Sequence, residues 1–257
     1  MTLRLLSYNI RFGGLGREQA LAETIVAAAP DLVVFQEATR PEVIERIAEA
    51  TKFPYWAARR NHSIGFLSRQ QVDYHEWHYP AGARHSFLEI VPAGSNARVF
   101  GLHLSARFSK WDEQRRTREI RALLNGIKRH QDGFHVLVGD FNTLAPGEAL
   151  NIDRMPAWIR ALIWISGRKL QRETIQLMLD AGYNDGYRML HPEVKGYTFP
   201  TWDPHVRLDY VFVPRAFADR LASCEVLCEP KERIRAASDH CPLVAELALK
   251  PQEAQKN

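Results

Sequence analysis

Polar side chains that can bind a metal ion or transfer a proton stand at the borders of several apolar, strand-like runs in this sequence. The run Leu3–Tyr8 ends at Asn9, and the run that begins at Leu243 is preceded by two titratable groups, Asp239 and His240. A charged group beside a buried strand is costly unless it is paired, solvated or bound to a metal. The set consists of Asn9, Glu37, His103, Asp140, Asn142, Asp209, Asp239 and His240. We therefore expect these strand ends to converge on one polar site.

The residue types in this set favour binding of a metal ion and of phosphate. Carboxylate and amide oxygens are ligands that Mg²⁺ takes in proteins, together with several waters. An imidazole can donate from one ring nitrogen and accept at the other, so His103 and His240 could act as acid and phosphate clamp near neutral pH. Ser238-Asp239-His240 is not a serine-hydrolase triad, because triad members come from separate segments and meet in space.

Alternating strand-like and helical segments must position these side chains. Helices are expected over residues 17–29, 41–51, 111–130 and 172–181, and Gly182 suits the end of the last one. Antiparallel pairing is expected for residues 65–68 with the run from Val72, and for residues 86–91 with residues 98–104. The sequence therefore predicts an α/β sandwich of mixed sheets with helices outside.

The composition is that of an ordinary globular protein. The chain has 257 residues, of which 46% are hydrophobic and 25% are charged, with a net charge of +4 and a pI near 9.0. We expect one catalytic domain over residues 1–250 and a disordered tail over residues 251–257. The mild positive charge fits a polyanionic substrate but does not define one.

The cysteines and the apolar segments bear on cellular location. The N-terminus lacks the pattern of a secretory signal, and no run of about 18 apolar residues offers a membrane span. Cys224, Cys228 and Cys241 are odd in number, give no disulfide framework and match no zinc spacing. We therefore expect unpaired thiols and a cytoplasmic protein.

Residues 154–169 differ from the rest of the chain, because they combine tryptophan and isoleucine with arginine and lysine and contain no acid. One interpretation is a helix or lid that packs on the domain with its arginines outward. The other is an element that contacts the substrate or a membrane surface. The basic helix with Arg115, Arg116, Arg118 and Arg121 is interpreted as a solvated surface helix rather than a DNA-binding patch.

Six short motifs occur in an order that resembles the endonuclease/exonuclease/phosphatase superfamily. They are SYNIR, QE, HLS, GDFN, RLDYVFVP and SDHCPL, and together they span nearly the whole chain. The sequence is similar to deoxyribonuclease I, exonuclease III and inositol-phosphate phosphatases. This resemblance implies a four-layered sandwich of two packed sheets flanked by helices. It also implies a phosphoesterase with Mg²⁺ or Mn²⁺ as cofactor and a phosphorylated substrate.

The resemblance also implies roles for the motif residues. Glu37 matches the principal metal ligand of the superfamily, Asn9 matches an amide that helps to hold the metal region, and Asp239 matches a carboxylate on the metal side. Asp140 and Asn142 match the pair that aligns the attacking water and contacts the phosphate.

Both histidines have counterparts in the superfamily. His240 matches the essential histidine, with Asp209 as the carboxylate that orients and charges it. His103 matches the second histidine of the deoxyribonuclease-I-like and phosphatase branches, which contacts the scissile phosphate or assists the leaving group. Two departures stand out: Arg84-His85 aligns where a glutamate supports the second histidine, and Arg11 stands where the exonuclease-III-like branch often has an acid.

The resulting hypothesis is metal-dependent hydrolysis of a phosphodiester or phosphomonoester by in-line attack of water. The alternatives are an endonuclease or exonuclease that acts on DNA, and an inactive binding protein on the same fold. Nucleic acid, a small phosphoester and a lipid head group all stay open as substrates, with peripheral membrane contact through residues 154–169 as a further alternative. A monomer is expected. The substrate itself does not follow from a fold.

Overall fold

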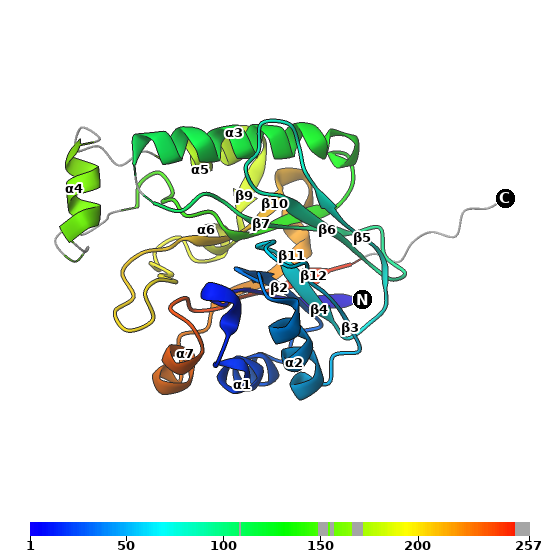
Figure 1. The fold of residues 1–257 in the computed structure, drawn as a ribbon. Coiled ribbons are helices and arrows are strands. Elements are labelled where there is room, and N and C mark those ends of the chain that lie inside the picture. Colours follow the sequence, from blue (N-terminus) through cyan, green and yellow to red (C-terminus); the bar gives the residue numbers. More distant parts are fainter. Residues whose placement is uncertain (108, 149–153, 155–156, 166–171, 250–257) are drawn as a thin grey trace.

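Two six-stranded β-sheets lie face to face between two layers of helices (Figure 1). The computed structural model describes residues 1–107, 109–148, 154, 157–165 and 172–249. The first sheet has the strand order β11–β12–β1–β2–β4–β3, and the second has the order β5–β6–β7–β8–β10–β9. This arrangement confirms the predicted four-layered α/β sandwich of mixed sheets.

The strands are short and lie in the following ranges. The first sheet contains β11 (Leu221–Val226), β12 (Leu243–Ala248), β1 (Thr2–Asn9), β2 (Leu32–Gln36), β4 (Gly65–Ser68) and β3 (Tyr55–Ala57). The second sheet contains β5 (Val72–His78), β6 (Phe87–Pro92), β7 (Arg98–His103), β8 (His135–Asp140), β10 (Asp209–Pro214) and β9 (Tyr183–Asp185).

Helices cover the outer face of each sheet. The first sheet is covered by α1 (Glu18–Ala28), α2 (Pro41–Thr51) and α7 (Lys231–Ala237), and the second by α3 (Lys110–Gly126) and α5 (Glu173–Asp180) (Figure 1). The short helix α6 (Gly186–Leu190) packs on β10 and β11, and α4 (Ala157–Ile165) lies at one end of the molecule (Figure 1). The four predicted helices are confirmed, with a short 3₁₀ turn, Lys128–His130, after α3.

The core has three parts, because both faces of each sheet are covered. Successive side chains of a strand point to opposite faces. In β1, Leu3 and Leu5 pack between the two sheets, whereas Leu6 and Tyr8 pack against the helices outside the first sheet. A strand buried on both faces is expected to be apolar nearly throughout, so the few polar residues at strand ends require a separate explanation.

Each sheet contains one parallel pair of strands. In the first sheet β1 runs parallel to β2, with Asn9 opposite Gln36, and in the second β7 runs parallel to β8, with His103 opposite Asp140. The carboxyl ends of two parallel strands meet at the same edge of a sheet. Each parallel pair therefore brings the polar residues at its two strand ends together.

The predicted antiparallel pairing of residues 65–68 with the run from Val72 is wrong. Strand β4 pairs antiparallel with both β2 and β3, so both of its edges are occupied within the first sheet. Strand β5 belongs to the second sheet, where it pairs with β6. The other predicted pairing, of β6 with β7, is confirmed.

Two of the three cysteines form a disulfide, which corrects the expectation of unpaired thiols. Cys228 and Cys241 are joined with a Cα–Cα distance of 5.2 Å, and Cys224 is free and buried. The two meet because the N–H of Leu227 donates to the carbonyl of Pro242, which aligns the segment after β11 with the segment before β12. The expectation of a cytoplasmic location rested in part on unpaired cysteines, so the disulfide removes that argument and the location stays a prediction.

The interpretation of α3 as a solvated basic helix is wrong for one arginine. Arg116 is 1% exposed, and its Nε and Nη2 donate to Glu113 at 3.0 and 2.8 Å. A buried guanidinium is tolerated when it has such a two-point carboxylate partner. Arg118 and Arg121 are exposed as expected, and Arg115 is half-buried.

Residues 154–169 and the C-terminal tail are described only in part. Trp164 and Ile165 of α4 are each 61% exposed, and the guanidinium of Arg154 pairs with Asp203. Contact of this stretch with a membrane stays a prediction. Within the ranges given above, no helix combines the length and hydropathy needed to cross a membrane. The predicted disorder of residues 251–257 lies outside the described residues.

Candidate active site

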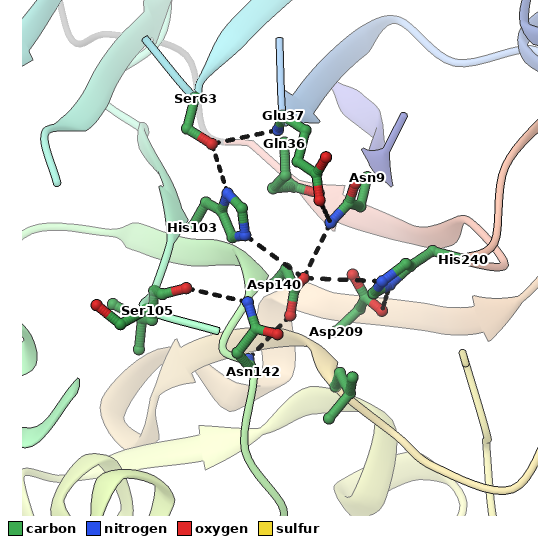
Figure 2. A network of polar contacts seen from close by, with 12 residues as sticks. Asn9, Gln36, Glu37, Ser63, His103, Ser105, Asp140, Asn142, Asp209 and His240 are labelled. Carbon is green, nitrogen blue, oxygen red and sulfur yellow. Dashed lines mark hydrogen bonds and ion pairs between the residues drawn. The ribbon is translucent and has the colours of Figure 1, made fainter. Parts of the chain in front are cut away.

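The strand ends meet at one edge of the sandwich, as the sequence predicts (Figure 2). The first sheet supplies Asn9 from the end of β1 and Glu37 directly after β2. The second sheet supplies the last residues of β7 and β8, and Asp209 at the start of β10 lies opposite Asp140 in register. His240 comes from the segment before β12 and closes the cluster from the first-sheet side (Figure 2).

Asp140 lies at the centre of the cluster and is 1% exposed. Its Oδ1 accepts the N–H of Asn142 at 2.8 Å, and its Oδ2 accepts from Nδ2 of Asn9 at 3.0 Å. Burial raises the pKa of Asp140, while the positive charge of His240 lowers it and the negative charge of Asp209 raises it again. This carboxylate is therefore ionised most readily with positive charge beside it.

Gly139 permits the close approach of strands that positions Asp140. Its φ is +147°, and a Cβ atom at this position would lie 1.9 Å from the carbonyl oxygen of Leu102 on β7. A larger residue would therefore push β8 away from β7 and separate His103 from Asp140. The close contact between β7 and β8 therefore explains why a glycine precedes Asp140.

His240 is held by Asp209 inside the protein. Its Nδ1 lies 2.9 Å from Oδ2 of Asp209, and both residues are nearly completely buried. Burial alone would lower the pKa of His240, but the charge of Asp209 and the hydrogen bond to it outweigh burial and raise the pKa to about 10. The ring is therefore an imidazolium at neutral pH, as the predicted pairing with Asp209 requires.

His103 is held differently, by a hydroxyl group instead of a carboxylate. Its Nδ1 hydrogen bonds to Oγ of Ser63, and the same Oγ accepts the backbone N–H of Glu37 at 3.3 Å (Figure 2). Burial lowers the pKa of His103 to about 4, with the negative charge of Glu37 opposing that shift. His103 is therefore neutral near pH 7, which makes the two imidazoles chemically different.

Both imidazoles face the same carboxylate oxygen. Nε2 of His103 lies 3.8 Å and Nε2 of His240 lies 3.9 Å from Oδ2 of Asp140. These distances are too long for direct hydrogen bonds and leave each Nε2 available to a third group. The arrangement can contact the oxygens of a tetrahedral anion from two sides while a carboxylate faces it from a third.

Asn9 lies between two carboxylates and orients both of them. Its Nδ2 donates to Oε1 of Glu37 at 3.4 Å as well as to Asp140, and its side-chain oxygen Oδ1 accepts the N–H of Arg11 at 2.9 Å. Asn9 therefore orients two carboxylates through its amide nitrogen, and its role as a direct metal ligand stays a prediction. Asp239 is adjacent through Ser238, whose Oγ donates to the carbonyl of Asn9 at 2.6 Å.

Arg11 occupies the position where part of the superfamily has an acid. Its Nε lies 3.2 Å from Oδ2 of Asp239, and the two side chains are 44% and 17% exposed. An exposed pair of this kind contributes about 0–1 kcal/mol, so a cation could displace it at low cost.

The donor set fits a hard divalent cation. Glu37 and Asp239 offer carboxylate oxygens that are partly accessible to solvent, and such ligands suit Mg²⁺ and Mn²⁺. Among the described residues, one group of three such side chains, Asp140, Asp209 and His240, has ligand atoms within 4.8 Å of one another. Both candidate sites contain atoms that are engaged in hydrogen bonds, namely Nδ1 of His240 with Asp209 and the two carboxylate oxygens of Glu37 with Asn9 and the N–H of Phe12. Solvent reaches Glu37 and Asp239, whereas Asp140 and Asp209 are buried, which makes the first pair the better candidate.

Ser63 and His85 are the residues that the sequence analysis missed or misassigned. At Arg84-His85, where the superfamily has a glutamate that supports the second histidine, Nδ1 of His85 pairs with Glu119 at 2.9 Å. The ring of His85 instead lies beside that of His103, with the centroids 6.2 Å apart. Ser63 lies two residues before β4, so its place near the start of a strand is the signal that could have revealed it.

Comparisons with known proteins identify the family and the fold. Residues 6–240 match the model of the endonuclease/exonuclease/phosphatase family. No curated protein sequence matches the chain. The fold is similar to that of a 3′ phosphatase, NExo, from Neisseria bound to a product DNA hairpin, with 20% identity, a TM-score of 0.67, and 96% of this chain and 99% of that chain covered.

Two further solved structures have the same fold. The 3′-5′ exonuclease NExo from Neisseria meningitidis is 21% identical, with a TM-score of 0.69 and coverage of 95% of this chain and 99% of that one. An AP endonuclease from Archaeoglobus fulgidus is 17% identical, with a TM-score of 0.68 and coverage of 95% and 98%.

The fold and the site together define a hydrolytic phosphoesterase. Since the match extends over nearly the whole length, the chain belongs to the endonuclease/exonuclease/phosphatase family.

Proposed function

We propose that this protein hydrolyses a phosphoester by in-line attack of water, with Mg²⁺ or Mn²⁺ held beside Glu37 and Asp239. The observation that carries the proposal is the pair of differently held imidazoles, His103 and His240, which both face Oδ2 of Asp140. A cation in the neighbouring oxygen cluster would neutralise charge on the phosphate, which otherwise repels a nucleophile.

The buried residues around Asp140 then divide the work between them. Asp140 accepts a proton from the attacking water as the new P–O bond forms, and the ester P–O bond opposite it breaks. His240, as an imidazolium fixed by Asp209, places positive charge next to a phosphoryl oxygen. Since Ser63 occupies Nδ1 of His103, the neutral ring donates a hydrogen bond from Nε2–H to the departing oxygen. That oxygen takes its proton from solvent, to which Asp140 returns the proton that it accepted. The side-chain amide of Asn142 donates to the carbonyl of Leu104 at 3.0 Å, which fixes the turn after Asp140.

DNA is the substrate class that has the most support. One neighbour in fold was solved with a product DNA hairpin and another is described as an AP endonuclease. The net charge of +4 suits a polyanion. A lipid head group and a small phosphoester are the competing substrates, and neither has a comparable observation in its favour.

Hydrolysis of chromogenic esters tests the proposal. Bis(p-nitrophenyl) phosphate and p-nitrophenyl phosphate are incubated with the protein in Mg²⁺, in Mn²⁺ and in EDTA. We expect release of nitrophenol that requires the metal, and equal rates with and without the chelator would contradict the proposal. Nicking of supercoiled DNA, run beside a phosphoinositide panel, then separates DNA from lipid substrates.

A further inference from the structure

A pocket opens next to His103, lined in part by residues 103–107 and by residues of α3. Its volume is about 510 Å³, which lies in the range of ligand sites, about 300–1,000 Å³. His103 lines this pocket as well as the catalytic cluster, so a ligand could extend from one to the other. Three arginines, Arg84, Arg107 and Arg115, line its walls.

The pocket carries an excess of positive charge. Among the described residues, the guanidinium groups of Arg84 and Arg107 have no carboxylate partner, and both residues are exposed. Arg115 has one, because its Nη1 lies 3.6 Å from Oδ1 of Asp112. His85 also lines the pocket, paired with the buried Glu119. Two arginines therefore face the pocket with their charge uncompensated.

The loop that carries Arg107 is fixed by a buried network. Nη1 of Arg116 donates to the carbonyl oxygens of Ser105 and Arg107, at 2.7 and 2.6 Å. Glu113, which holds Arg116, also accepts from the hydroxyl of Thr143 at 3.0 Å. The backbone of Arg107 has a φ of +87°, a conformation that costs free energy in a residue with a side chain and persists where its surroundings impose it.

We propose that this pocket binds a second phosphate of the substrate, the phosphodiester next to the scissile one in a nucleic-acid strand. The proposal rests on the phosphoesterase function proposed above, which places the scissile phosphate between His103 and His240. Guanidinium groups bind phosphate through several directed hydrogen bonds. Arg84 and Arg107 lie in a pocket beside His103, so they are suited to bind the phosphate that neighbours the scissile phosphate in the strand. The pocket would favour nucleotide chains over esters that carry a single phosphate.

Matched chromogenic thymidine esters test this proposal. In the first pair, thymidine 5′-(p-nitrophenyl phosphate) is compared with the same ester that has an additional phosphate at the 3′ position. In the second pair, thymidine 3′-(p-nitrophenyl phosphate) is compared with the same ester that has an additional phosphate at the 5′ position. We expect kcat/KM to rise at least about tenfold with the second phosphate in one of the two pairs, as for a contact with a charged group. A ratio near one in both pairs overturns the proposal.

Variants then show whether the arginines produce this preference. The double variant Arg84→Gln/Arg107→Gln removes the two guanidinium groups that lack a carboxylate partner and leaves Arg115 in place on α3. It is expected to lower the two-phosphate to one-phosphate ratio about tenfold. Arg118→Gln, an exposed arginine one turn further along α3, is the matched control and keeps the ratio. A ratio that is the same in the double variant and in the wild type overturns the assignment.

Binding measurements separate this proposal from the proposed function. In an Asp140→Asn background, calorimetry with thymidine 3′,5′-bisphosphate and with each thymidine monophosphate gives affinities that do not depend on turnover. Tighter binding of the bisphosphate than of either monophosphate, lost in the double variant, supports phosphate binding in the pocket. This holds even if the wild type hydrolyses none of the esters, because the absence of hydrolysis contradicts only the phosphoesterase function. Equal affinities overturn the pocket even if the esters are hydrolysed.

Discussion

The two sheets contribute to the site in the same way topologically but in different chemical environments. Each has one parallel pair whose strand ends carry the site residues. On the first-sheet side, Glu37 is partly exposed and Asp239 is paired with the half-exposed Arg11. On the second-sheet side, Asp140 and Asp209 are each 1% exposed.

This difference separates two tasks that a phosphoesterase must perform. A cation has to enter, exchange water and bind a substrate oxygen, which requires carboxylates that solvent can reach. Proton transfer needs side chains whose positions and pKa values are fixed, and burial with a dedicated partner fixes both, as for His240 with Asp209. The comparison therefore supports the proposal that the partly exposed carboxylates on the first-sheet side bind the cation and that the buried cluster of Asp140, Asp209 and His240 carries the proton chemistry.

The largest expected effect is at His240 in the buried cluster, where Asp209 of the second sheet holds its ring. Changing His240→Ala removes the imidazolium next to the phosphate and leaves Asp209 buried without its partner. We expect kcat/KM for the aryl diester to fall about 10³-fold, within the range for loss of a general acid or base. Rates are measured at saturating Mn²⁺. The control is His75→Ala, which changes an exposed histidine on β5 and is expected to retain activity. A loss of less than threefold in His240→Ala would contradict the role given to His240.

The next effect tests the first-sheet side. Glu37→Gln keeps the size of the side chain but removes the charge that would hold the cation. The Mn²⁺ concentration for half-maximal activity is expected to rise at least about tenfold, as for loss of metal-site ligands and their supports, with partial recovery of the rate at high metal. Glu42→Gln, a solvent-exposed glutamate on α2 that pairs with Arg60, provides the control. An unchanged metal requirement with a lower rate would place the cation elsewhere.

A smaller effect is expected from the hydroxyl group that connects the two sides. Ser63 hydrogen bonds to His103 and accepts the N–H of Glu37. Ser63→Ala should lower kcat about fivefold through loss of one hydrogen bond, with little change in KM, and Ser63→Thr should restore most of the rate. Equal losses in the two variants would indicate that the site responds to packing instead of to the hydroxyl.

The smallest effect concerns Arg11. Arg11→Ala removes the partner of Asp239, and because exposed ion pairs contribute about 0–1 kcal/mol, the affinity for Mn²⁺ should rise by less than about fivefold. Calorimetric titration of Mn²⁺ measures this change. A large loss of affinity would show that Arg11 supports the cation site instead of competing with it.

Sequence reasoning identified the parts of the site that depend on local pattern. Asn9, Glu37, His103 and Asp140 could be found because each ends an apolar run, and the run itself predicts the strand. Ser63 could not be assigned, because its contact with His103 depends on β4 lying beside β2 in the first sheet and facing β7 in the second.

The remaining errors have the same cause. Cys228 and Cys241 are 13 residues apart, and their pairing requires the alignment of β11 with β12. Arg116 stands beside the half-buried Arg115, and its burial depends on the preceding loop, where the carbonyl oxygens of Ser105 and Arg107 accept from its Nη1. Pairings between strands and between distant side chains are set by tertiary packing, which no local pattern contains.

The most direct test of this division between the sheets is to locate the cation. Anomalous diffraction from crystals of the protein soaked in Mn²⁺ gives its position independently of activity. The account predicts a peak in contact with the carboxylate of Glu37 and on the side of Asp239. A peak enclosed by Asp140, Asp209 and His240, with Glu37 free of it, would contradict the separation of metal binding from proton chemistry.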